Sequence, residues 1–337
     1  MQTITVVGVD IAKSVFQVHA IGADGQVAIR RRLRRGEVAR FFQGLAPCLV
    51  GMEACGSAHH WAREIAAFGH QVRLMPAAYV KPYVKRGKTD AADAEAIAEA
   101  VTRPTMRFVA VKTVEQQAVL MLHKTRDLLV RQRTMLINAL RGHLAEHGVV
   151  AAKGPGGVSS LIAMLHEEQG SLPPLARSAL HSIASQLRAL GAEVERLETK
   201  ILEWHRADAT SRRLATIPGI GPITASAIAA TVPDVSLFRN GRQFAAWLGL
   251  TPRAHSSGGH ERQAGISKQG DGYIRRLMVV GATAVMRMAR KNAGRGWAMQ
   301  LLERKRPKVV AVALANKSAR IAWAVMARGE SYAARAA

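Results

Sequence analysis

Cysteine is scarce in this chain. Only Cys48 and Cys55 occur among 337 residues, and neither belongs to a CxxC pair or lies near a paired set of histidines. We therefore expect two reduced, half-buried thiols rather than a disulfide framework. The adjacent residues His59 and His60 would point to different faces of a helix, so they make a poor zinc clamp.

Long apolar runs are also missing. No stretch of about 18 apolar residues could span a bilayer, which argues against a membrane protein. Residues 1–20 carry Asp10 and Lys13 within an alternating apolar pattern and do not resemble a cleaved signal peptide. We expect a cytoplasmic protein with no membrane partner.

Acidic residues are few. Lys and Arg number 48 against 24 Asp and Glu, which gives a formal charge of +24, while 48% of the residues are hydrophobic. That combination describes a folded protein with a cationic surface rather than a disordered basic tail. The expected partner is nucleic acid, because each phosphate neutralised by Lys or Arg releases counterions and strengthens binding.

Against this basic background, two carboxylates three residues apart are conspicuous in Lys88-Thr89-Asp90-Ala91-Ala92-Asp93. If Asp90 opens a helix, Asp90 and Asp93 share one face and are close enough to bind one divalent cation. Thr89 is also a natural N-cap, and acids in a first helical turn complement the helix dipole. The motif alone leaves both interpretations open.

The first third of the chain predicts an α/β domain. A β-branched run at 3–9 ends on Asp10, and an apolar strand at 48–52 ends on Glu53. The other expected elements are strands at 15–21, 26–33 and 72–75, and helices at 36–45 and 58–68. Hairpin strands followed by a βαβ order imply a mixed sheet. Because ligands of open α/β sheets bind at the carboxyl ends of strands, Asp10 and Glu53 are expected to converge with Asp90 and Asp93.

The middle of the chain predicts a helical arm, with long helices over 113–147 and 173–206. The second carries an unbroken heptad seam, made of Leu180, Ile183, Leu187, Leu190, Val194, Leu197, Ile201 and Trp204. Such a seam packs against another long helix, either 113–147 or a second subunit, and we favour an arm that also mediates dimerisation. Residues 153–157, Lys-Gly-Pro-Gly-Gly, give the clearest loop signal.

The last region contains two segments with potential chemistry. Pro218-Gly219-Ile220-Gly221 forms a turn between two expected helices, and in a helix-hairpin-helix the backbone around Gly219 and Gly221 would suit a phosphate. An ordinary connection between packed helices is the alternative. Further on, Ser256 and Ser257 precede Gly258-Gly259 in what is either a flexible basic loop or a nucleophile segment. The cations that border it are Arg253, Arg262, Lys268, Arg275 and Arg276.

Taken together, these motifs resemble one known family. They are Val7-Gly8-Val9-Asp10-Ile11-Ala12-Lys13, Gly51-Met52-Glu53-Ala54, residues 88–93, residues 218–221, Gly249-Leu250-Thr251-Pro252 and residues 256–259. The chain resembles the Asp-Glu-Asp-Asp transposases of bacterial insertion sequences, which are related to the Piv and MooV site-specific DNA invertases and include the bridge-RNA-guided recombinases. The resemblance covers nearly the whole chain and keeps the motifs in family order.

The resemblance implies a fold in three parts. Residues 1–112 would form an α/β domain like the RuvC resolvase, with a ribonuclease-H-like mixed sheet. Residues 113–208 would form a helical coiled-coil dimerisation arm. Residues 209–337 would form a mainly α C-terminal transposase domain with a helix-hairpin-helix-like segment.

It also implies an acidic tetrad of Asp10, Glu53, Asp90 and Asp93 that binds Mg²⁺, with Mn²⁺ as an alternative. A serine, matched to Ser257 with Ser256 as fallback, would form a covalent phosphoserine link to DNA. The implied partners are DNA, a structured guide RNA encoded by the element, and further copies of the chain. Dimers would pair into a tetramer on DNA, the serine of one subunit completing the acidic site of another, in a bacterial cytoplasm at the nucleoid.

Three alternatives remain. Gly8-Val9-Asp10-Ile11-Ala12-Lys13 before a β-hairpin also opens sugar-kinase and actin-like ATPase folds, but those need further Gly-rich phosphate loops where this chain is helical and basic. A non-enzymatic architectural or RNA-binding protein would use the acids as caps and the serines as loop. A plain Holliday-junction resolvase would use only the N-terminal acids.

Overall fold

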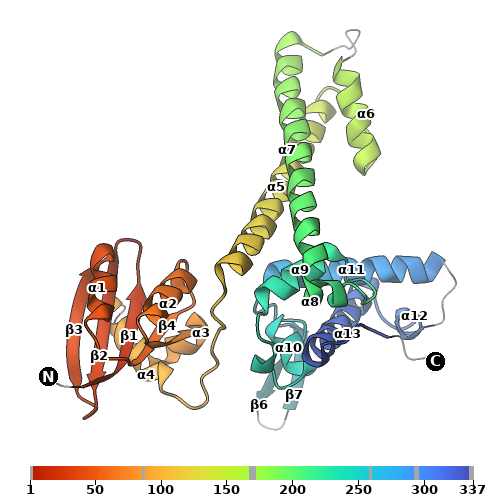
Figure 1. Ribbon diagram of the computed structural model, residues 1–337. Helices are drawn as coiled ribbons and strands as arrows, with labels where there is room; N and C mark the ends of the chain where they lie inside the picture. The colour runs from red at the N-terminus through yellow and green to blue at the C-terminus, as the bar shows by residue number, and fades with distance from the viewer. Residues whose placement is uncertain are drawn as a thin grey trace. The chain divides into compact units, whose positions relative to one another are not determined.

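A computed structural model describes residues 3–85, 87, 89–166, 172–257, 260–291 and 296–333. The chain forms two compact units, shown in Figure 1. Unit 1 comprises residues 1–117 with 232–237, and unit 2 comprises residues 118–231 with 238–337. The three-part division at 112 and 208 stays a prediction.

Unit 1 is built on a five-stranded mixed sheet in the order β3-β2-β1-β4-β5. The strands are β1 (Ile4–Ile11), β2 (Val15–Gly22), β3 (Val27–Arg34), β4 (Leu49–Glu53) and β5 (Gln71–Met75). β1, β2 and β3 pair antiparallel, whereas β4 runs parallel to both β1 and β5. The predicted mixed sheet is thus confirmed, and its order is compatible with a ribonuclease-H-like domain.

Helices cover both faces of this sheet. The helices of unit 1 are α1 (Val38–Gln43), α2 (Ala58–Ala67), α3 (Ala77–Val80) and α4 (Asp90–Val101), with 3₁₀ turns at Arg35–Glu37, Lys81–Tyr83 and Val235–Leu237. One core cluster joins Val7, Val9 and Phe16 of the sheet to Phe42 of α1 and Ile65 of α2. A second cluster, on the α4 side, contains Ile97 and Val101 together with Val6 of β1. The sheet is therefore buried on both sides, and α4 is the layer that faces β1, β2 and β4.

Two glycines let α4 lie directly on the sheet. A Cβ atom added to Gly8 of β1 would lie 2.5 Å from the Ala98 nitrogen and 2.8 Å from the Ala98 Cβ, and still closer to the Ala94 carbonyl oxygen. A Cβ atom on Gly51 of β4 would lie 2.8 Å from the Val101 Cβ. Real side chains do not approach this closely, so the absence of side chains at Gly8 and Gly51 sets the distance between α4 and the strands.

Unit 2 contains the long helices, α5 (Val114–Ala145, most of which lies in this unit) and α7 (Pro174–Ala207), with α6 (Pro155–His166) between them in the chain (Figure 1). Leu140 and Leu144 of α5, Leu161 of α6, and Leu180 and Leu187 of α7 form one buried cluster. Nearer the other end of α5, the Arg126 Nε donates to Glu198 Oε1 of α7 at 2.7 Å. The N-terminal half of the predicted heptad seam therefore packs within the chain.

The predicted loop at 153–157 is wrong in part. Pro155, Gly156 and Gly157 form the first turn of α6. Proline is favoured in the first turn of a helix, because its missing N–H has no intrahelical acceptor there. Gly157 also packs against backbone, since a Cβ atom there would overlap the Ala152 carbonyl. Gly157 thus serves close packing, whereas a Cβ atom on Gly156 would meet nothing within 4 Å.

The remaining elements of unit 2 are mostly helical. They are α8 (Ala209–Leu214), α9 (Pro222–Thr231), α10 (Gly241–Trp247), α11 (Gly272–Lys291), α12 (Trp297–Leu302), α13 (Pro307–Arg328), and a hairpin of β6 (Pro252–Ser257) and β7 (His260–Ile266). α13 is central, because it packs against α8, α10, α11 and α12.

α13 also corrects the expectation that no segment could span a membrane. Of the described helices, it alone is long and apolar enough to cross a bilayer by length and composition. Lys317 and Arg320 interrupt its apolar run in the sequence. Its buried side, which includes Val310, Ala315 and Ala319, is what a core helix of a folded unit presents to its neighbours.

Candidate active site

The four predicted acids lie at one edge of unit 1. Asp10 is the second-last residue of β1 and Glu53 is the last residue of β4, and these strands are parallel neighbours. Asp90 is the first residue of α4 and Asp93 lies in its first turn. Since α4 lies on Gly8 and Gly51, its acidic N-terminus is held near the carboxyl ends of the two strands.

Electrostatic coupling among the acids supports this convergence. Burial raises the pKa of the Asp10 carboxyl above its ordinary value, and the charges of Asp93 and Asp90 raise it further, against a smaller opposing hydrogen bond from the Ile11 backbone. Burial likewise raises the pKa of Glu53, followed by the charges of Asp10 and Asp93. Within the described part of the chain, none of the four forms an ion pair with Lys or Arg. The site is a concentration of uncompensated negative charge in a basic protein.

The donor set fits a hard divalent cation, because carboxylate oxygens are the ligands that Mg²⁺ and Mn²⁺ take. As the side chains stand, no group of three His, Cys, Asp or Glu residues among those described is arranged to hold a metal ion. Carboxylates without a cation between them repel one another. Metal binding at this edge remains a prediction.

The helix-capping interpretation of the same motif also holds. The Thr89 Oγ accepts a hydrogen bond from the Ala92 N–H at 3.2 Å, so Thr89 is the N-cap of α4. Asp90 and Asp93 then lie in the first turn, where the helix dipole favours negative charge. Lys88 lies outside the described residues.

The two cysteines are both free thiols. Cys48 is buried, with its Sγ 3.4 Å from the Nδ1 of His70. Cys55 is exposed, so the expectation of two half-buried thiols is wrong for both residues. Cys55 follows the end of β4 in the turn that leads into α2, where no packed element covers it.

The serine segment is a β-hairpin rather than the flexible loop that its composition suggested. Ser256 pairs with Glu261 and Ser257 with His260 across β6 and β7. This register leaves only Gly258 and Gly259 between the strands, and both lie outside the described residues. Two glycines flanked by extended segments are a hairpin signal, and the sequence interpretation missed it. For Ser256, Ser257 and Arg262 the structure describes the backbone position alone.

Several of the predicted phosphate-binding cations make internal contacts. The Arg253 Nη2 donates to the Ser267 carbonyl at 3.0 Å, and the Arg275 Nη1 donates to the carbonyls of Leu248 and Gln269 at 2.9 and 2.7 Å. Arg276 forms an ion pair with Asp127 of α5. Lys268 is exposed and has a positive φ of 57°. Arg275 thus joins the two loops beside the hairpin, and nucleic-acid contact by these four residues stays a prediction.

The glycine turn lies between α8 and α9, as expected, and packs against α11. Gly219 has a φ of 85°, and a Cβ atom there would lie 3.0 Å from the Gly281 carbonyl oxygen. Gly221 has open space where a Cβ atom would stand. Packing explains Gly219, while Gly221 leaves room for a ligand, so phosphate binding at this turn stays a prediction.

Sequence reasoning missed an apolar stripe on α5. Met121, Leu128 and Met135 follow one another at intervals of seven residues and are 67%, 47% and 69% exposed. A seven-residue repeat of apolar side chains is the spacing of a helix–helix seam. This repeat has three members and is weaker than the eight-residue seam on α7.

Comparisons with known proteins show the family of this chain. Residues 211–296 match the model of the transposase IS116/IS110/IS902 family, and residues 7–148 match the transposase model of the Asp-Glu-Asp-Asp IS110 type. The chain is 50% identical to a probable family 20 transposase of Pseudomonas aeruginosa, over 97% of this chain and 98% of the relative. The chain belongs to the IS116/IS110/IS902 family of transposases.

Two further relatives carry insertion-sequence names. The transposase for insertion sequence element IS1111A of Coxiella burnetii is 40% identical, over 98% of this chain and 92% of the relative. The transposase for insertion sequence element IS1328 of Yersinia enterocolitica is 39% identical, over 98% of both chains. This protein is therefore a DNA transposase, and the four acids lie within one matched segment while Ser257 lies within the other.

Proposed function

We propose that this transposase cuts and rejoins DNA strands at an insertion sequence, with Ser257 as nucleophile and Asp10, Glu53, Asp90 and Asp93 as a Mg²⁺ site. The observation that carries the proposal is the electrostatic coupling of four carboxylates at the edge where β1, β4 and α4 meet. A structural cluster of this kind, without cationic partners among the described residues, destabilises the folded chain unless a cation binds.

Asp10, Glu53, Asp90 and Asp93 would hold the cation, and the bound ion would neutralise charge on the phosphate oxygens during strand transfer. The four side chains set the position of the scissile phosphate relative to unit 1. The raised pKa values of Asp10 and Glu53 make binding of the cation weaker in acid, because a protonated carboxyl is a poor ligand.

The covalent step is a transesterification. The Ser257 Oγ loses its proton and forms a bond to phosphorus, the bond from phosphorus to one neighbouring deoxyribose oxygen breaks, and that oxygen takes up a proton and leaves as a free hydroxyl. Attack by the hydroxyl of a second strand reverses the step and releases Ser257. The position of Ser257 at the end of β6 supports its choice over Ser256, since it is the last paired residue before Gly258 and Gly259.

Dimerisation is part of the proposal. The exposed stripe of Met121, Leu128 and Met135 on α5 supports a helix–helix contact with a second copy, because apolar side chains at heptad spacing lose water on pairing. We propose that dimers pair into a tetramer on DNA, the serine of one subunit acting with the carboxylates of another.

Guidance by an element-encoded RNA completes the proposal. The formal charge of +24 suits a structured RNA in addition to duplex DNA, because both are bound through their phosphates. The prediction is that the RNA from the flanking non-coding DNA is needed for strand exchange.

The test uses the full chain with Mg²⁺, its own element ends and that RNA. Wild type is expected to give a denaturation-resistant protein–DNA adduct that Ser257→Ala abolishes and Ser256→Ala retains. Adduct loss in Ser256→Ala alone would move the nucleophile by one residue, and no adduct in any variant would refute the covalent step.

A mixing experiment tests the shared site. Asp10→Ala and Ser257→Ala are each expected to be inactive alone, but equal amounts mixed before DNA is added are expected to recover part of the activity. No recovery, with mixed dimers shown by differential tags, would place both groups of one site in a single subunit.

A resolvase that uses only the acidic site is the alternative enzyme. It predicts full nicking by Ser257→Ala and no adduct. A non-enzymatic basic protein predicts that Asp10→Ala and Glu53→Ala leave any strand exchange unchanged.

A further inference from the structure

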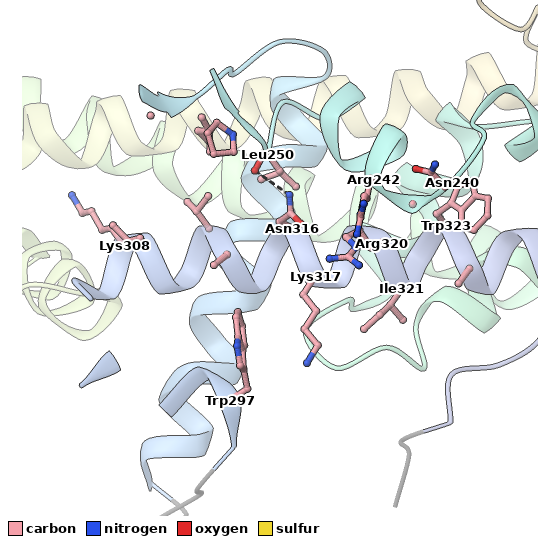
Figure 2. Close-up of a pocket in the computed structure, with 18 of the residues that line it drawn as sticks. Asn240, Arg242, Leu250, Trp297, Lys308, Asn316, Lys317, Arg320, Ile321 and Trp323 are labelled. Atoms are coloured by element: carbon pink, nitrogen blue, oxygen red, sulfur yellow. Dashed lines mark hydrogen bonds between the residues drawn. The ribbon is translucent and has the colours of Figure 1, made fainter. Parts of the chain in front are cut away.

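Unit 2 contains a large groove that the site above does not use. It runs along α13, between the start of α10, the base of the β6–β7 hairpin and Trp297 of α12, and its volume is about 1290 Å³ (Figure 2). This exceeds the ~300–1,000 Å³ of an ordinary small-molecule pocket, so the groove has room for a segment of a polymer.

The rim of the groove is cationic. Arg242, Lys308, Lys317 and Arg320 line it, no acidic residue is among its lining residues, and none of the four cations has an ion pair with a described residue. All four are exposed. Charges left uncompensated around a concave surface attract a polyanion.

The cations are arranged along one face of α13. Lys308, Val312, Asn316 and Arg320 follow one another at intervals of four, and the adjacent row contains Val309, Ala313, Lys317 and Ile321. Lys308 and Arg320 are about 18 Å apart along the helix axis, which is the length of about five stacked nucleotides of one strand. The cations of α13 therefore extend over a longer distance than a single anion would occupy.

The floor of the groove is apolar and aromatic. Trp297 is 45% exposed, and the Lys317 Nζ lies 5.2 Å from its ring centroid, a cation–π contact that orients the ring. The Trp323 Nε1 donates to the Phe238 carbonyl at 3.1 Å, which fixes the second indole. In Figure 2, Trp297 and Lys317 extend from neighbouring elements toward the same side of α13. An exposed indole beside a row of cations is the combination that binds unstacked bases.

We propose that this groove binds unpaired DNA, with its phosphates along α13 and a base stacked on Trp297. A duplex keeps its bases paired and would use only the cations, leaving the aromatic floor without a role. The proposal rests on the proposed function in one respect, since strand exchange between duplexes must expose unpaired DNA.

The test is equilibrium binding of the full chain to a fluorescein-labelled oligothymidylate 15-mer and to a 15-base-pair duplex, by fluorescence anisotropy in EDTA. Trp297→Ala is expected to weaken single-strand binding about tenfold and to change duplex binding less than twofold, because one base–aromatic stack is lost. Trp297→Phe should retain most of the affinity.

The matched cation variants are Lys317→Ala inside the groove and Arg328→Ala, an exposed cation on the same helix that does not line it. Lys317→Ala should weaken single-strand binding and reduce the slope of log K against log salt concentration by about 0.7. Arg328→Ala should weaken single-strand binding less. Circular dichroism and the thermal midpoint report whether each variant is folded.

The proposal would be overturned if Trp297→Ala lost the same affinity for single strand and duplex, or lost affinity for neither. Tighter, Trp297-dependent binding of a uridylate 15-mer would assign the groove to RNA and overturn it as well. The binding assay contains no metal and measures no adduct, so failure of the Ser257 chemistry leaves its outcome unaffected. If the groove does not bind unpaired DNA, the adduct assay still tests the Ser257 chemistry.

Discussion

The close approach of α4 to β1 makes Gly8→Ala a test of how the acidic site is positioned. The added Cβ atom would lie 2.8 Å from the Ala98 Cβ and nearer still to the Ala94 carbonyl oxygen. Carbon atoms in contact prefer about 3.5–4.0 Å, so α4 must move outward by about 1 Å. Overpacking of this kind costs about 1–3 kcal/mol of unfolding free energy.

The effect on activity should exceed the effect on stability. Asp90 and Asp93 move with α4, whereas Asp10 and Glu53 stay with the strands. A misplacement of about 1 Å can cost about 100-fold in rate. We expect Gly8→Ala to remain folded and to lose about 100-fold in Mg²⁺-dependent strand exchange.

Urea unfolding and adduct formation are measured on the same preparations. Gly36→Ala is the matched control, because a Cβ atom there meets nothing within 4 Å. Ala98→Gly should not rescue Gly8→Ala, since the backbone oxygen of Ala94 still blocks the methyl group. Wild-type stability and activity in Gly8→Ala would refute the claim that this glycine sets the helix position.

Three further outcomes follow from the described contacts. Burial lowers the pKa of His123 to about 4, so the folded chain binds a proton at this residue less readily than the unfolded chain does. Up to about 3 kcal/mol of unfolding free energy should therefore be lost as the pH falls from 6.5 to 4. Urea titrations should show a smaller loss in His123→Gln. Burial, followed by repulsion from Asp93 and Asp90, raises the pKa of Asp10, so Asp10→Asn should raise the metal-free thermal midpoint at pH 7 and abolish the increase that Mg²⁺ gives wild type. An unchanged midpoint would contradict the unfavourable burial and repulsion of this charge. Leu128→Glu should weaken self-association at least tenfold in analytical ultracentrifugation, and the exposed control Gln132→Glu should not.

The sheet could be predicted from local patterns because each strand has its own signal. β1 and β4 are apolar runs with Asp10 and Glu53 near their ends; β4 ends on Glu53 as predicted, whereas β1 continues one residue beyond Asp10 to Ile11. The rule that ligands bind at the carboxyl ends of strands then predicted that the four acids lie at one edge, and this prediction needed no information about packing.

The hairpin and α6 could not be predicted from composition, because glycine is common both in flexible loops and at positions of close packing or tight turns. Gly156 and Gly157 lie in a helical first turn, and Gly258 and Gly259 separate two paired strands, yet both pairs indicate loops by composition. Gly157 is distinguished only by the Ala152 carbonyl that it packs against, a contact no sequence pattern encodes. Packing across distant segments decides such cases.

The acidic motif at the start of α4 reconciles two interpretations that the sequence left as alternatives. Thr89 caps the helix and the dipole favours Asp90 and Asp93, so the first turn stabilises charges that the strand-end acids repel. Capping reduces the cost of holding four carboxylates together, while burial and then the charges of the neighbouring acids still raise the pKa values of Asp10 and Glu53. A divalent cation would remove the remainder, which is why a helix N-terminus with two acids is suited to carry half of a metal site.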